Sequence, residues 1–161
     1  MSTARPAAGV QVWRIGWKGA LSLASLPFGS LLADGRWHVA ADRVPVVYAG
    51  GTRALCQLER RVHCNGCAPK DMVLLRLALP KGARLEDASP LLPANWRSDM
   101  GATQAIGADW ARSGRSLGLW VPSYVETAER NLVINPSHPQ YSAIVLHVEK
   151  NPFEFDPRLF A

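Results

Sequence analysis

The clearest pattern of apolar and polar positions lies in residues 44–65, where a short apolar run is followed by two glycines and an uninterrupted amphipathic stretch. Val44–Tyr48 is rich in β-branched side chains and bounded by turn residues, which predicts a short and largely buried strand. Gly50 and Gly51 would end this strand. The hydroxyl of Thr52 can accept a hydrogen bond from a free N–H group of the following turn, so it predicts the start of a helix.

One side chain of the expected helix does not follow its amphipathic pattern. At about 100° per residue, Leu55, Leu58 and Val62 form one apolar stripe, and arginines lie opposite. Glu59 lies only about 40° from Leu55, so its carboxylate faces the apolar side, where an unpaired charge is costly. An ion pair or a position at the edge of the core would explain this carboxylate, and so would a functional site.

One run of period two, several short apolar runs and a second helical pattern predict the other elements. These are a strand at Val10–Trp17, a loop with a short helical turn at residues 18–35, a strand at Met72–Leu79, a connection at Leu85–Ser98, a helix at Ala102–Ser113, and strands at Leu117–Val121, Asn131–Ile134 and Tyr141–Val148. Strands mix with two main helices without regular βαβ alternation, which predicts an α+β fold with small mixed or antiparallel sheets. We expect a single domain over residues 1–161, with its core at about 10–150 and a tail at 151–161.

Two polar side chains stand out within these strands. Arg14 shares a side of its strand with Val10 and Val12, so it either extends its charged end to solvent or points into a pocket that holds an anion. Ser123 comes directly after a buried strand and Pro122, a place where ligands often bind. Ser123 could equally be only a turn residue.

Composition and charge narrow the class of protein. A chain of 161 residues with 48% apolar and 19% charged residues is typical of one globular domain. No run approaches the roughly 18 apolar residues of a membrane span, and residues 1–8 lack the apolar core of a signal peptide, so we expect a cytoplasmic protein. The net charge is +5, but the basic residues are scattered, which favours an anionic ligand held by a few arginines over nucleic acid.

The cysteines permit a metal site without requiring one. Three cysteines are an odd number, which argues against a disulfide framework. His63-Cys64-Asn65-Gly66-Cys67 could supply zinc ligands together with Cys56, but the second Cys-x2-Cys pair of a zinc knuckle is missing. We therefore expect no metal. The sequence also lacks the glycine fingerprints of dehydrogenases and P-loop NTPases, the zincin motif and the nucleophile elbow of α/β-hydrolases.

The order of several short motifs resembles the RES domain family, which is named for an Arg, a Glu and a Ser and occurs as toxins of bacterial toxin–antitoxin pairs. The motifs are Trp13-Arg14-Ile15, Gly35-Arg36-Trp37, Val47-Tyr48, Leu58-Glu59, Leu119-Trp120-Val121-Pro122-Ser123 and Asn131-Leu132-Val133-Ile134-Asn135-Pro136-Ser137-His138-Pro139. The resemblance covers nearly the whole chain. It departs from the family at His38, where Asn is common, and in the segment between Cys64 and Met72.

The resemblance implies a fold related to ADP-ribosyltransferase toxins and an enzyme that degrades NAD by cleaving its nicotinamide–ribose bond, with water or inorganic phosphate as acceptor. NAD would be the substrate, with no further cofactor. The positions that match the family's functional residues are Glu59, Arg36 and Ser123 as catalytic residues and Arg14, Tyr48 and Asn131 as substrate-binding residues. The resemblance also implies an Xre-like helix-turn-helix antitoxin that forms a hetero-oligomer with this chain.

The residue types suit this chemistry. Cleavage develops oxocarbenium character at the ribose, which a carboxylate such as Glu59 can stabilise. Arg36 and Arg14 carry the forked donors that grip a pyrophosphate, and Tyr48 can stack on the nicotinamide ring or bond its amide. Ser123 would then hydrogen-bond the ribose or a phosphate.

Two other functions fit the same residues. An ADP-ribosyltransferase that modifies a macromolecule shares the first half of the reaction, and only the acceptor separates it from an enzyme that depletes NAD. A binding module that holds an acidic partner through its basic surface would need no turnover. In such a module Glu59 would be dispensable.

Overall fold

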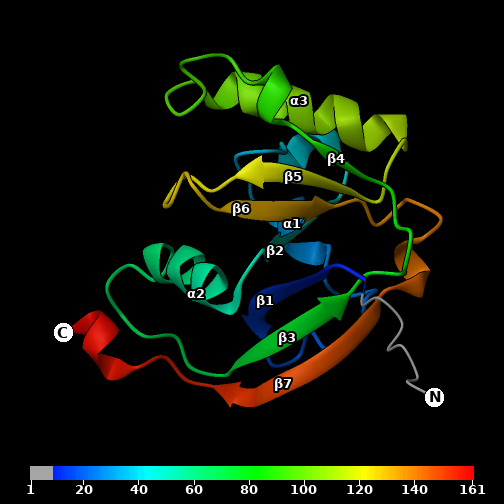
Figure 1. The fold of residues 1–161 in the computed structure, drawn as a ribbon. Coiled ribbons are helices and arrows are strands. Elements are labelled where there is room, and N and C mark those ends of the chain that lie inside the picture. The colour runs from blue at the N-terminus through cyan, green and yellow to red at the C-terminus, as the bar shows by residue number, and fades with distance from the viewer. Residues whose placement is uncertain (1–8) are drawn as a thin grey trace, which may run out of the picture.

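Seven strands form one sheet in the computed structural model, which describes residues 9–161 (Figure 1). The expectation about a signal peptide concerns residues 1–8, which lie outside this range. The strands are β1 (Gln11–Trp17), β2 (Val47–Gly50), β3 (Met72–Ala78), β4 (Leu85–Asp87), β5 (Gly118–Pro122), β6 (Arg130–Ile134) and β7 (Val145–Phe153). Their order is β4-β5-β6-β2-β1-β3-β7, and all neighbours are antiparallel except β4 and β5.

Three helices accompany the sheet in the described part of the chain: α1 (Phe28–Leu32), α2 (Arg53–Val62) and α3 (Met100–Ser113). Short 3-10 turns occur at Ala40–Asp42, Ser89–Leu91, Tyr141–Ala143 and Pro157–Phe160. The predicted α+β class is confirmed, but the strands join in one large sheet. No helix of residues 9–161 is long and apolar enough to span a membrane.

The sheet opens between its two central strands. β1 and β2 are paired only at Trp13 and Gly50, whereas β1 pairs with β3 along its whole length and β2 pairs with β6 over four residues. Since neighbouring strands normally pair residue by residue, a single pair means that β1 and β2 diverge on one side of it. This divergence leaves room for a cavity at the centre of the sheet.

Alternating side chains bury both faces of the sheet. On β3, Val73, Leu75 and Leu77 belong to one apolar cluster, while Leu74 belongs to another with residues of α2 and the C-terminal segment. A third cluster forms where Trp110 and Ala111 of α3 meet β5 and β6. α2 and α3 therefore cover different parts of the sheet, one near β1 and β2 and the other near β4 and β5 (Figure 1).

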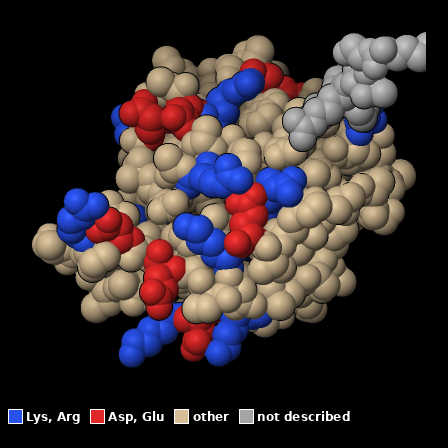
Figure 2. Space-filling view, turned by 60° about the horizontal axis from the view of Figure 1, so that its bottom comes forward, with Lys and Arg blue, Asp and Glu red and all other residues tan. Residues whose placement is uncertain are grey.

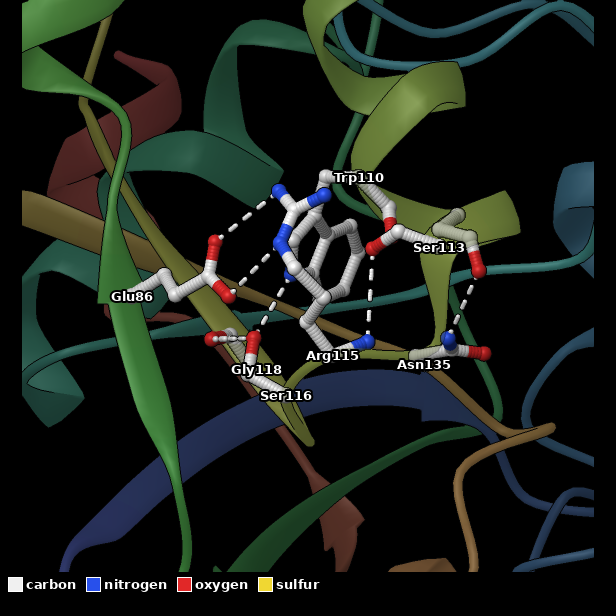
Figure 3. A network of polar contacts seen from close by, with 8 residues as sticks. Glu86, Trp110, Ser113, Arg115, Ser116, Gly118 and Asn135 are labelled. Atoms are coloured by element: carbon white, nitrogen blue, oxygen red, sulfur yellow. Dashed lines mark hydrogen bonds and ion pairs between the residues drawn. The ribbon is translucent and has the colours of Figure 1, made fainter.

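A polar network fixes the C-terminal end of α3 to the sheet (Figure 3). The indole N–H of Trp110 donates to the hydroxyl of Ser116 at 2.8 Å, and the Asn135 amide donates to the carbonyl of Ala111 at 2.9 Å. Arg115 forms an ion pair with Glu86 of β4. Gly114, with a φ of +61°, ends the helix in the left-handed conformation that glycine adopts without strain.

Several predicted boundaries were wrong. β2 begins at Val47 and includes Gly50, so only Gly51 lies beyond the strand. The connection at 85–98 contains the short strand β4, and the last strand, β7, starts at Val145 and continues to Phe153. Because Phe153 and Phe155 are buried, residues of the expected C-terminal tail form part of the core.

The expected apolar stripe of α2 is also only partly correct. Leu55 is buried as predicted, but Leu58 and Val62 are 41% and 50% exposed. Cys56 occupies the buried position beside Leu55. The face of α2 that turns toward the sheet is therefore rotated from Leu58 toward Cys56, Glu59 and Arg60, three residues at helical spacing that all line the central cavity.

Candidate functional site

A cavity of about 600 Å³ lies where β1 and β2 diverge, a volume typical of sites for small molecules and cofactors. Its walls come from β1, β2, α2, the loop that contains Gly35 and Arg36, and the ends of β5 and β6. Five residues predicted from the sequence line it, namely Arg14, Arg36, Tyr48, Glu59 and Asn131. Ser123 is fully buried and reaches the cavity through Glu59.

The start of α2 determines where Glu59 lies. The hydroxyl of Thr52 accepts a hydrogen bond from the backbone N–H of Leu55 at 3.0 Å, so the predicted cap is confirmed. A Cβ atom at Gly50 would approach the backbone of Cys56 within 3.0 Å, so α2 packs directly against the end of β2. The first turn of α2 is thus held close to the sheet, and Glu59 lies at the cavity wall.

The Glu59 carboxylate is held by two neutral donors. The Ser123 hydroxyl donates to Oε1 at 2.6 Å, and the Asn131 amide donates to the same oxygen at 2.7 Å. Within residues 9–161, Oε2 has no hydrogen-bond partner and no cation lies within ion-pair distance of the carboxylate. The structural ion pair considered for Glu59 is therefore wrong. One carboxylate oxygen is fixed by the protein, and the other remains available to a ligand.

Ser123 acts through Glu59. Its hydroxyl donates to Glu59 and accepts from the backbone N–H groups of Val125 and Glu126 at 3.1 and 3.0 Å, so its one donor and two acceptor positions are all used. In this arrangement the Ser123 hydroxyl has no position left for the expected hydrogen bond to a ribose or a phosphate. Ser123 instead positions the carboxylate, a contact between residues 64 apart in sequence.

Tyr48 is fixed by a histidine to which the sequence assigned no role. The imidazole of the buried His38 lies 2.9 Å from the carbonyl of Ala33 through Nε2, and 2.7 Å from the Tyr48 hydroxyl through Nδ1. A carbonyl can only accept, so in the neutral ring Nε2 carries the proton and the Tyr48 hydroxyl donates to Nδ1. Burial raises the pKa of Tyr48, which keeps the phenol protonated.

α3 holds the loop that carries Arg36. The hydroxyl of Thr103 donates to the carbonyl of Arg36 at 2.7 Å, and the Gln104 amide donates to the carbonyl of Gly35 at 3.0 Å. The Arg36 guanidinium lies over the ring of Tyr124, with its Cζ atom 4.1 Å from the ring centroid. Stacking leaves the edge of a guanidinium free, so Arg36 can still donate to an anion.

Arg14 extends from β1 across the opening of the sheet. Its guanidinium donates to the carbonyl of Tyr48 at 2.8 Å, which satisfies a backbone group of β2 that β1 does not pair with. Burial lowers the pKa of Arg14 from its usual value. The structure places Arg14 in the wall of a pocket, and the anion expected there stays a prediction.

The cavity has an excess of positive charge. Three arginines line it, Arg14, Arg36 and Arg60, and none of them forms an ion pair with another described residue, while the acidic residues in its lining are Asp34 and Glu59. Elsewhere many basic residues form ion pairs with acidic ones, as the ion pairs of Arg53 and Arg76 with Glu149 illustrate. Figure 2 shows this alternation of basic and acidic groups on one face. The arginines of the cavity combine a place in its wall with the lack of an ion pair among the described residues, which suits them to an anionic ligand.

The cysteine motif does not assemble a metal site in the described chain. No group of three or more His, Cys, Asp or Glu side chains among residues 9–161 is placed to hold a metal ion. The Cys64 thiol donates to the carbonyl of Arg60, Cys67 is exposed, and burial raises the pKa of Cys56 to about 12. A thiol with so high a pKa is neither a good metal ligand nor a good nucleophile at neutral pH.

Replacement of Cys64 and Cys67 by serine is expected to leave catalytic activity and metal content unchanged, because neither thiol lies in the wall of the cavity. Nicotinamide release and elemental analysis of the purified double variant, beside the unmodified protein, measure this. Stoichiometric zinc in the unmodified protein that disappears from the variant would overturn the expectation.

The sequence did not indicate the roles of three residues of the site, His38, Tyr124 and Arg60. His38 was noted only as a departure from the family pattern, and Tyr124 follows Ser123 in a loop without periodicity. A stripe of Leu55, Leu58 and Val62 turns Arg60 to the polar side of α2, but Leu58 and Val62 are exposed. A stripe that included Cys56 would have turned Arg60 toward the sheet.

Comparisons with known proteins agree with this architecture. The family model of the RES domain matches residues 11–156. A protein of Sphingobium sp. (strain YBL2) named Prs ADP-ribosylating toxin is 36% identical over 137 residues, which are 81% of this chain and 83% of that protein. A protein of Yersinia enterocolitica named Toxin Res is 30% identical over 159 residues, 93% of this chain and 99% of that protein.

A further protein named Toxin Res, from Pseudomonas putida, is 34% identical over 153 residues, which are 92% of this chain and 99% of that protein. Among solved structures, the M. tuberculosis MbcT–MbcA toxin–antitoxin complex has a chain that is 17% identical and superposes with a TM-score of 0.62. That similarity covers 93% of this chain and 86% of the other, and it shows the same fold.

Proposed function

We propose that this chain, which belongs to the RES domain family and is a toxin, acts by cleaving the nicotinamide–ribose bond of NAD. The observation that carries the proposal is the Glu59 carboxylate, which is held by Ser123 and Asn131 through one oxygen and keeps its second oxygen unpartnered among the described residues. A fixed, uncompensated negative charge beside a cavity is what a cationic transition state requires.

The reaction follows from this charge. When the bond between ribose C1′ and the nicotinamide nitrogen breaks, its electron pair goes to the pyridinium nitrogen, which becomes neutral, and positive charge develops on the ribose. Glu59 stabilises that charge. Either water or inorganic phosphate then forms a new C–O bond at C1′, and a proton is released from water or retained on the new phosphate ester. The products are nicotinamide and ADP-ribose or its phosphate ester.

The other residues of the cavity supply binding and orientation. Arg36, stacked on Tyr124, is suited to the diphosphate because a guanidinium can donate two parallel hydrogen bonds to phosphate oxygens. Tyr48 presents a ring whose position His38 fixes, and this ring can stack on the nicotinamide. Asn131 and Ser123 keep the carboxylate in one orientation, which avoids reorganisation during the reaction.

A partner protein that occupied the same cavity would inhibit the enzyme. A cytoplasmic enzyme that consumes NAD would harm its own cell unless its site were closed, and one solved structure with this fold is a toxin–antitoxin complex. We propose that an Xre-like antitoxin partner occupies the cavity in an inhibited hetero-oligomer. Carboxylates of the partner could bind Arg14 and Arg36 in place of phosphate groups.

The decisive experiment expresses this chain alone and together with the adjacent gene. The chain alone is expected to arrest growth while cellular NAD falls, coexpression is expected to restore both, and the purified chain is expected to release nicotinamide from NAD. A correctly folded chain that is harmless and leaves NAD constant would exclude the proposal and favour the binding module.

Transfer of ADP-ribose to a macromolecule is the second candidate, because the Sphingobium relative is named an ADP-ribosylating toxin. NAD labelled in its adenine separates the two functions. If label remains on a protein or nucleic acid after denaturation, in amounts equal to the nicotinamide released, the chain is a transferase. If all of the label is recovered as free ADP-ribose or its phosphate ester, it degrades NAD.

A further inference from the structure

A second cluster of positive charge lies in the cavity apart from Arg36. Arg60 follows Glu59 on the face of α2 that lines the cavity, and Arg14 enters the cavity from β1. α2 packs against β1, the strand that carries Arg14, and Arg60 lies over the ring of Trp17 in the same strand. Burial lowers the pKa of Arg14, and the charge of Arg60 lowers it further. Two like charges in a partly buried place repel each other, and no described acidic residue forms an ion pair with either.

Much of the hydrogen-bonding capacity of these two arginines is unused. Arg14 gives one N–H group to the carbonyl of Tyr48. The Nε atom of Arg60 is buried without a partner among the described residues, and its Nη2 atom has only a weak contact with the sulfur of Met72 at 4.0 Å. A guanidinium carries five donors, and buried donors that remain unpaired are costly. An anion with several oxygens could satisfy donors of both arginines and remove their repulsion.

The sheet order separates this cluster from Arg36. Arg60 lies over the ring of Trp17 in β1, at 5.5 Å, whereas Arg36 lies over Tyr124, which follows β5. β5 and β1 are separated by β6 and β2 in the sheet. The cavity therefore has one group of cationic donors on each side, and Glu59 precedes Arg60 directly in the chain.

We propose that Arg14 and Arg60 form a second phosphate-binding subsite beside Glu59, distinct from the site at Arg36. This inference rests on the proposed function for its ligand, because the phosphate group has two possible sources. Inorganic phosphate could bind there as the acceptor, so that one of its oxygens forms the bond to C1′ while the electron pair of the C–N bond leaves with nicotinamide. Alternatively, the subsite could hold part of the diphosphate of NAD.

Calorimetry tests the subsite without turnover. Inorganic phosphate and ADP-ribose are each titrated into the Glu59→Gln chain and into the same chain with Arg60→Gln added. Loss of one charge-assisted contact to a phosphate is expected to weaken binding by about tenfold or more. Weaker binding of inorganic phosphate identifies the acceptor as the ligand, and weaker binding of ADP-ribose with unchanged phosphate binding identifies the diphosphate.

The matched control is Arg61→Gln in the same background, because it removes the same charge from the next position of α2. Arg61 donates to the carbonyl of Leu159 at the surface and does not line the cavity, so this change is expected to leave both affinities unaltered. If Arg60→Gln lowers only the melting temperature and changes neither affinity, Arg60 serves to pack against Trp17 and the subsite does not exist.

The two proposals fail in different ways. A wild-type chain that releases no nicotinamide, but whose phosphate or ADP-ribose binding depends on Arg60, contradicts the enzymatic function and keeps the subsite. If the Arg60→Gln chain releases nicotinamide at rates that depend on phosphate and on NAD as they do in wild type, the proposed function stands. The subsite is then contradicted. In wild-type protein, initial rates of nicotinamide release at varied phosphate and at varied NAD give this second readout.

Discussion

Glu59→Gln is expected to lower the rate of nicotinamide release by about 10²- to 10³-fold, the range seen when a single electrostatic contact to a transition state is removed. Glutamine retains an oxygen that can accept from Ser123 and Asn131, so its side chain can stay in the same place. Only the negative charge at the cavity is lost. The measurement is the initial rate with purified protein, together with a thermal melt.

The control for this substitution is Glu154→Gln, which removes an exposed carboxylate outside the cavity. It is expected to retain the wild-type rate. The Glu59→Gln protein is expected to melt no earlier than wild type, because the carboxylate it loses is partly buried without an ion pair among the described residues. Wild-type turnover in a folded Glu59→Gln protein would remove Glu59 from the mechanism and leave the binding module as the better explanation.

Gly107→Ala is expected to have the largest effect on stability among the glycine substitutions in α3. The backbone of α3 passes so close to the buried Trp37 that a Cβ atom at Gly107 would overlap the Trp37 carbonyl oxygen. Overpacking of this kind typically costs about 1–3 kcal/mol, which corresponds to a fall of roughly 3–10 °C in the melting temperature for a chain of this size. Thermal melts of the purified variant measure it.

The same substitution should also affect the site. Trp37 follows Arg36, whose carbonyl accepts from Thr103 on the same face of α3, so a displaced helix moves the loop that presents the guanidinium. We expect a higher KM for NAD in whatever fraction remains folded. Gly101→Ala is the control, since its Cβ atom would meet nothing closer than 3.5 Å and alanine favours a helix. Equal melting temperatures for the two variants would contradict the close approach at Gly107.

Local patterns in the sequence determined much of the secondary structure. Short apolar runs predicted β1, β3, β5 and β6 to within a few residues, because their apolar side chains must be buried whatever the neighbouring strands are. The cap at Thr52 and the glycine after α3 act on their own backbone groups, so they were visible without the fold. The order of short motifs likewise predicted the RES domain family, which is confirmed.

Structural features that depend on partners distant in the sequence could not be predicted from local patterns. β4 has three residues and exists because it pairs with β5, and β7 extends to Phe153 because β3 offers a partner there. Leu58 was expected to be buried, but the rotation of α2 depends on its contact with β1 and β2. Propensity and periodicity describe a segment alone, whereas these features arise from pairing across the sheet.

The site shows the same division. The sequence indicated Glu59 because a carboxylate on the apolar side of a helix needs an explanation, and it indicated Arg14 because an arginine stood among valines. Only the tertiary structure decided that Ser123 and Asn131 meet one oxygen of Glu59, that His38 fixes Tyr48, and that Arg60 faces the cavity. These contacts join residues from different strands and helices, and their geometry is set where β1 and β2 diverge, a feature of the whole sheet that no single segment encodes.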